Sequence, residues 1–100
     1  MGYEFHITRA ENWFESEIDP ISRRDWEELA DSTPELRFTG YVDWSDIGPQ
    51  RIYEPHGDAT SFTWRGGKVD IKGVYSGDTE RLAHRLAEAL GGRIQGDDED

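Results

Sequence analysis

The chain has 100 residues, with 22 acidic and 11 basic side chains, so its formal net charge is −11. This length suits one domain, and we expect it to cover residues 1–96, followed by an acidic tail at 97–100. The acidic balance argues against direct binding of nucleic acid or of an anionic membrane, since both need clustered Lys and Arg. Cysteine is absent and no apolar run approaches the roughly 20 residues of a membrane span, which excludes disulfides, thiol chemistry and a spanning helix.

The negative charge is concentrated in the first part of the chain. Residues 1–58 hold 14 acidic and 5 basic side chains, a charge of −9, whereas residues 59–96 carry +2. Two interpretations stay open: an acidic surface for a partner, or an adaptation of the whole protein to solubility, salt or a GC-rich genome. The first residues lack the basic and apolar segments of a signal peptide, so we expect a cytoplasmic protein.

The first elements are a strand and a helix joined by a loop. Apolar and polar residues alternate over 3–8, which predicts a half-buried strand with His6 on its polar face. Residues 10–20 show no period and predict a loop. Ser22 is placed to cap a helix, with Ile21 and Trp26 as the two ends of a hydrophobic staple, and this helix should run to about residue 31.

A second strand and a long loop follow. Residues 36–44 predict a strand whose alternation Gly40 could shift by a bulge, with Leu36 and Phe38 among the candidates for its inner face. Residues 45–58 contain Gly-Pro and Pro-His-Gly, and we expect them to form a loop.

The second half predicts a hairpin, a helix and a short strand. Two alternating runs, 60–65 and 68–72, are joined by Gly66-Gly67, which favours a type I′ hairpin. A single apolar stripe over 78–90 predicts a helix, and residues 93–96 a last strand that could pair with the first. The expected fold is α+β in the order β-α-β-β-β-α-β, an antiparallel-rich sheet with both helices on one face.

The motifs of common enzymes are missing from the sequence. It has no G-x-S-x-G elbow, no phosphate-binding glycine loop and no H-E-x-x-H or EF-hand spacing, so we predict neither an enzyme nor a metal or cofactor site. The segment from Asp43 to Asp58 stands out because it mixes aromatic and acidic residues, as interfaces for basic proteins do. The residues predicted to bind a basic protein partner are Asp43, Trp44, Asp46, Tyr53, Glu54 and Asp58. The alternative is that Trp44 and Tyr53 only pack this segment on the sheet.

Both ends of the chain resemble a family of small bacterial proteins. Its members open with Tyr-x-x-His-Ile-Thr-Arg followed by two aromatics, as residues 3–14 do, and carry Gln-Gly-Asp-Asp near the end, as residues 95–98 do. Small acidic proteins of this kind are similar to the immunity proteins of bacterial toxin systems, which bind and block a toxin. The family has no established activity, so the resemblance to it implies no reaction, and the inhibitor function rests on the analogy with immunity proteins.

Three functions remain open from the sequence. The first is a non-enzymatic acidic protein that covers a basic surface of a toxin or another protein. The second is a small enzyme or ligand-binding domain around His6, Arg9 and Asp97, which would need these side chains to share one pocket. The third is a DNA mimic, whose carboxylates would take the place of phosphates.

Overall fold

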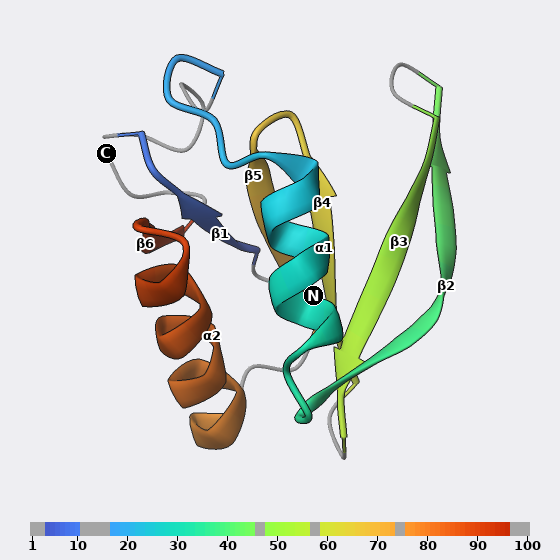
Figure 1. Cartoon of the computed structure of the whole chain (residues 1–100). Helices are drawn as coiled ribbons and strands as arrows, with labels where there is room; N and C mark the ends of the chain where they lie inside the picture. Colours follow the sequence, from blue (N-terminus) through green and yellow to red (C-terminus); the bar gives the residue numbers. More distant parts are fainter. Residues whose placement is uncertain (1–3, 11–16, 46–47, 57–58, 74–75, 97–100) are drawn as a thin grey trace.

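The computed structural model describes residues 4–10, 17–45, 48–56, 59–73 and 76–96. They form six strands and two helices (Figure 1). In chain order these are β1 (Phe5–Thr8), α1 (Arg23–Asp31), β2 (Leu36–Trp44), β3 (Gly48–Pro55), β4 (Thr60–Arg65), β5 (Lys68–Gly73), α2 (Gly77–Ala89) and β6 (Arg93–Gly96).

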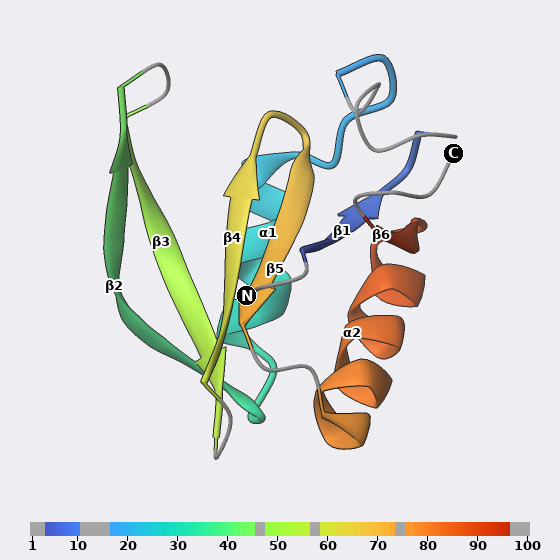
Figure 2. The ribbon, with the colours of Figure 1, turned by 180° about the vertical axis from the view of Figure 1, so that it is seen from behind.

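The strands form one antiparallel sheet in the order β2-β3-β4-β5-β1-β6. Both helices contribute to a single hydrophobic core, so they cover the same face of the sheet (Figures 1 and 2). The last strand pairs with the first along its whole length, from Phe5–Gly96 to Thr8–Arg93. The predicted α+β class, the helices on one face and this closing pair are confirmed.

Local sequence explains how the helices and the central hairpin form. The Ser22 hydroxyl accepts a hydrogen bond from the backbone N–H of Asp25 at 3.0 Å, and Ile21 and Trp26 are buried beside this cap. Gly66 and Gly67 both have positive φ angles, as a type I′ turn requires. The apolar stripe of α2 is buried as expected, with Leu82, Ala83, Leu86, Ala87 and Leu90 in the core.

The segment expected to be a loop contains an additional strand. Residues 48–55 form β3, which pairs with β2 from Leu36–Pro55 to Trp44–Gly48. The prediction of a loop over 45–58 was therefore wrong for most of the segment. Pro49 and Pro55 caused the error, because proline suits the ends of a strand as well as a turn, and both stand near the ends of β3.

The β2–β3 hairpin extends beyond the rest of the sheet. β3 pairs with β4 at Ile52–Thr63 and Tyr53–Phe62, near the base of the hairpin. From there the two strands run away from α2 (Figure 1). The register shifts between Phe38 and Gly40, which confirms the bulge expected at Gly40. Among the described residues, no helix covers the face of the hairpin that lies beside α1.

Candidate functional sites

Two exposed aromatic side chains lie on the β2–β3 hairpin. Phe38 is 50% exposed and Tyr41 is 63% exposed, and their rings meet edge to face at 5.2 Å between centroids. Phe38 lies opposite Tyr53, which packs on Trp26 of α1, so both aromatics occupy the face of the hairpin that is turned toward the helices. An exposed aromatic pair on a projecting element is the kind of surface that proteins use to bind one another.

A polar network fixes the base of this face. The Tyr53 hydroxyl donates to Asp31 at the end of α1 at 2.8 Å and accepts from Arg51 at 3.1 Å. Arg51 also forms an ion pair with Asp31 at 3.1 Å, and its guanidinium lies over the Phe38 ring at 5.8 Å. The hydrogen bond to Tyr53 raises the pKa of Arg51 above its usual value, while burial raises the pKa of the Tyr53 hydroxyl. We call Asp31, Phe38, Tyr41 and Arg51 the hairpin surface.

The predicted partner-binding residues fall on this hairpin but differ in exposure. Asp43 is exposed near its tip, and Trp44 ends β2. Glu54 is half-buried and faces Arg37 at 3.8 Å. Tyr53 is buried in the core, so its ring packs the segment on the sheet, as the alternative interpretation held. Asp46 and Asp58 lie outside the described residues.

Sequence reasoning missed the residues that form the hairpin surface. Leu36 and Phe38 were candidates for the inner face of their strand, and Phe38 does lie on the face turned toward the helices, but its side chain is half exposed instead of buried. The bulge changes the spacing, so that Phe38 and Tyr41, three residues apart, lie on the same face. Gly40 was the signal available in the sequence, since it marked where the alternation would shift.

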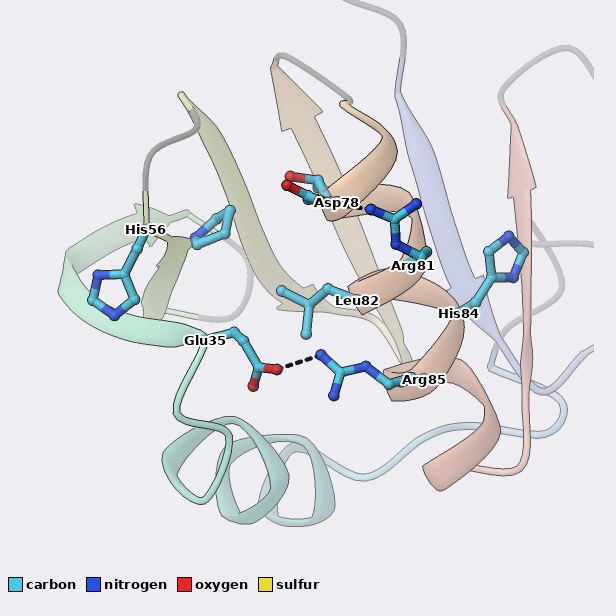
Figure 3. Close-up of a pocket in the computed structure, with 9 residues that line it drawn as sticks. Glu35, His56, Asp78, Arg81, Leu82, His84 and Arg85 are labelled. Carbon is cyan, nitrogen blue, oxygen red and sulfur yellow. Dashed lines mark hydrogen bonds and ion pairs between the residues drawn. The ribbon is translucent and has the colours of Figure 1, made fainter.

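A pocket of about 630 Å³ separates α2 from the end of β3. Pro55 and Leu82 contribute apolar wall, and Glu35 and Arg85 form an ion pair across it at 2.6 Å (Figure 3). The hydrogen bond from Arg85 lowers the pKa of Glu35. The volume is typical of small-molecule sites. However, the Arg85 guanidinium is already engaged by a carboxylate of the chain itself, which favours a role in holding α2 in place.

A row of four polar side chains crosses the other face of the sheet. Cross-strand pairing places Thr63, Asp70, His6 and Gln95 side by side on β4, β5, β1 and β6. All four are buried, with His6 only 3% exposed and Asp70 8% exposed. The half-buried strand expected over residues 3–8 is thus buried on both faces from His6 to Thr8.

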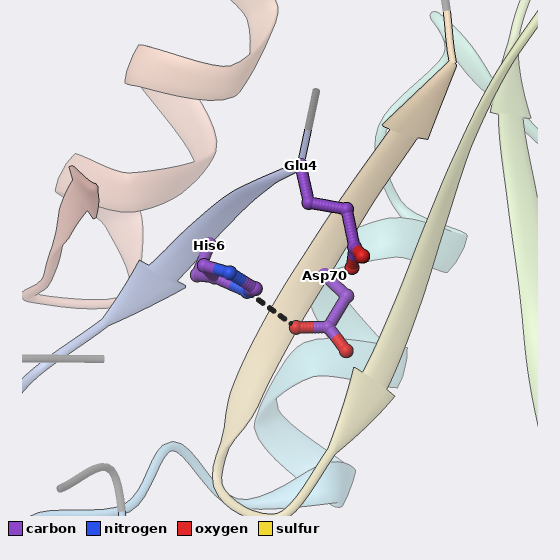
Figure 4. Close-up of side chains that lie close together, drawn as sticks. All are labelled: Glu4, His6 and Asp70. Atoms are coloured by element: carbon purple, nitrogen blue, oxygen red, sulfur yellow. Dashed lines mark hydrogen bonds and ion pairs between the residues drawn. The ribbon is translucent and has the colours of Figure 1, made fainter. Parts of the chain in front are cut away.

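His6 and Asp70 are the centre of this row. The imidazole Nδ1 lies 2.7 Å from Asp70 Oδ1 (Figure 4). The ammonium of Lys68 lies 3.3 Å from the same oxygen. The Glu4 carboxylate is beside them, and Lys72 lies 3.9 Å from it. His6 therefore points into a buried charged cluster and away from open solvent.

Arg9 lies on the opposite side of the sheet from His6. Its guanidinium donates to the carbonyl oxygen of Leu90 at 2.5 Å, at the end of α2, and lies 3.9 Å from Asp25 of α1. The helices cover that face, whereas His6 shares the other face with Asp70. The alternative pocket of His6 and Arg9 is therefore wrong as a shared site, and its third member, Asp97, lies outside the described residues.

The comparisons with known proteins add no relative. No family model matches the chain, and no curated protein or solved structure matches it. In the part of the chain that the structure describes, no helix is long and apolar enough to cross a membrane. The function must therefore be argued from the residues of this chain.

Proposed function

We propose that the chain is a non-enzymatic, cytoplasmic binding protein that covers a basic surface of another protein through its hairpin surface. The exposed pair of Phe38 and Tyr41, beside the fixed charges of Arg51 and Asp31, is the observation that carries this proposal. Tyr, Phe and Arg are enriched in the centres of protein interfaces, where large aromatic side chains contribute most of the binding free energy.

The hairpin surface has the rigidity that tight binding requires. Arg51 is held by Asp31 and the Tyr53 hydroxyl, and Phe38 is held between Tyr41, Tyr53 and the Arg51 guanidinium. Side chains that are already ordered lose less conformational entropy when a partner docks on them. The net charge of −11 would attract a basic partner and speed its association.

The resemblance at the two chain ends supports a more specific proposal. Immunity proteins bind and block a toxin, and by analogy this chain would cover the basic substrate-binding or catalytic face of a toxin. The product of the adjacent gene is therefore the first partner to test.

The experiment measures binding of the purified adjacent gene product to the wild-type chain and to a Phe38→Ser, Tyr41→Ser double variant. We expect the double variant to bind at least thirtyfold more weakly, the effect of losing roughly 2 kcal/mol at the centre of an interface. Ile18→Ser is the matched control, because Ile18 is also an exposed apolar side chain, at 78%, but lies outside the hairpin surface.

Two outcomes would contradict the proposal. One is that no basic partner binds at either low or high salt. The other is that Ile18→Ser weakens binding as much as the double variant does. A displacement assay with duplex DNA tests the DNA mimic, because a mimic must compete with DNA for the same site on the partner, and failure to compete removes that alternative.

The buried pair of His6 and Asp70 favours a second candidate function, a small ligand-binding domain. A histidine held against a carboxylate in a buried site is a common arrangement in ligand and metal sites. This function would use the face of the sheet opposite the helices, so it is compatible with partner binding at the hairpin.

A further inference from the structure

Three potential metal ligands meet on the face of the sheet opposite the helices. Glu4 precedes β1 by one residue and lies on the same side as His6, because alternate residues of a strand share a face. Asp70 lies directly opposite His6 on β5. One ligand atom from each of the three side chains lies within 4.8 Å of the others (Figure 4).

From this geometry we infer that Glu4, His6 and Asp70 bind a divalent transition-metal ion, with Zn²⁺ as the best match. One imidazole nitrogen and two carboxylate oxygens suit Zn²⁺, whereas Mg²⁺ and Ca²⁺ prefer ligand sets made of oxygen alone. Two carboxylates also balance the charge of a divalent ion. Three protein ligands would leave the fourth tetrahedral position to water.

The surroundings of the three ligands fit an ion that enters from one side. The side chains of His6 and Asp70 are 4% and 10% exposed, whereas that of Glu4 is 34% exposed. An ion could therefore reach the cluster past Glu4. The pairing of their strands fixes the backbones of His6 and Asp70, and the 2.7 Å hydrogen bond between their side chains must open for both to bind the ion.

In the metal-free protein, two lysines form ion pairs with the carboxylates of the site. Lys68 lies 3.3 Å from Asp70 and Lys72 lies 3.9 Å from Glu4. A divalent ion must displace these ammonium groups, so they lower the affinity for metal. Lys72 is half exposed, and its removal should leave the fold intact while strengthening metal binding.

The test uses Co²⁺ as a spectroscopic substitute for Zn²⁺, because tetrahedral Co²⁺ has intense visible absorption that changes with its ligands. We expect the wild-type protein to produce this absorption and Zn²⁺ to abolish it. Loss of one ligand in His6→Gln or Glu4→Gln should weaken Co²⁺ binding by about tenfold or more, and Lys72→Gln should strengthen it several-fold. His84→Gln is the matched control, because His84 is exposed on α2.

The variants also separate a metal site from a set of ion pairs that only stabilises the fold. Circular dichroism checks that each variant is folded. If His6→Gln does not fold, Glu4→Gln serves as the decisive variant. The inference is overturned if wild-type protein gives no tetrahedral Co²⁺ absorption, if Glu4→Gln keeps full affinity, or if His84→Gln loses it. Lys72→Gln binding no more tightly than wild type would overturn the role of the lysines as competitors.

Discussion

At the scale of single residues, Tyr53 joins the core to the hairpin surface. Its ring is buried and meets Trp26 edge to face at 5.7 Å. Its hydroxyl reaches the edge of the core, where it donates to Asp31 and accepts from Arg51. A tyrosine suits this position because its ring is apolar while its hydroxyl needs polar partners. The residue that positions Arg51 on the surface is thus also one of the largest in the core.

Tyr53→Phe removes the hydroxyl and keeps the ring. We expect it to lower the free energy of unfolding by about 1 kcal/mol, the net value of a typical side-chain hydrogen bond, as measured by urea denaturation. Tyr41→Phe is the control, since Tyr41 is largely exposed and its hydroxyl should contribute less than about 0.5 kcal/mol. Equal stability losses in the two variants would contradict the role given to the Asp31–Tyr53–Arg51 network.

The same substitution should change how stability responds to alkaline pH. Burial raises the pKa of Tyr53 in the folded protein above its ordinary value of about 10. When the pH rises past that ordinary value, the unfolded chain loses the Tyr53 proton while the folded protein keeps it. The folded state then binds more protons, so stability falls as the pH rises. We expect this alkaline loss to be smaller in Tyr53→Phe than in the wild-type protein, and urea denaturation across the alkaline range measures it.

At the scale of helices and strands, the sequence predicted the features that depend on residues close together in the chain. The cap at Ser22, the stripe of α2 and the Gly66-Gly67 turn are local patterns, and the structure contains all three. The pairing of β2 with β3 is also local, but the prolines and glycines around residues 48–55 hid it. The meeting of His6 and Asp70 was beyond reach, since the residues are 64 positions apart and only the register of β1 on β5 brings them together.

The ion pair between Glu35 and Arg85 connects two elements, the turn before β2 and helix α2. The hydrogen bond from Arg85 lowers the pKa of Glu35, so the pair stabilises the fold above the ordinary pKa of a glutamate. This contribution disappears as the pH falls through the lowered pKa. We therefore expect Arg85→Gln to unfold at a higher pH than the wild-type protein in an acid titration followed by tryptophan fluorescence.

Arg81→Gln is the matched control for this prediction. Arg81 pairs with Asp78 within the same helix, so its loss removes a salt bridge without separating two elements. Both arginines are exposed, so the change that Arg85→Gln makes in the pH of unfolding should be modest. An equal shift in the two variants would show that Arg85 contributes only charge and does not hold α2 to the turn.

At the scale of the whole molecule, the excess of 11 negative charges acts on both folding and binding. Like charges repel one another more strongly in the compact state than in the expanded chain, so the excess destabilises the fold. The same excess attracts a basic partner over long distances. Salt screens both interactions, because the Debye length falls to about 10 Å at 0.1 M and about 3 Å at 1 M.

We therefore expect NaCl to change stability and partner binding in opposite directions. Thermal unfolding should shift upward with salt by about 4–8 °C if the repulsion costs about 1 kcal/mol, whereas association with the basic partner should slow at least tenfold. Glu88→Lys, near the end of α2, is the control for stability, since it reduces the negative excess and should reduce the response to salt. If stability falls with NaCl instead, the ion pairs of the fold stabilise it by more than the repulsion among its negative charges destabilises it. Association that does not change with NaCl would mean that the acidic excess does not serve the partner.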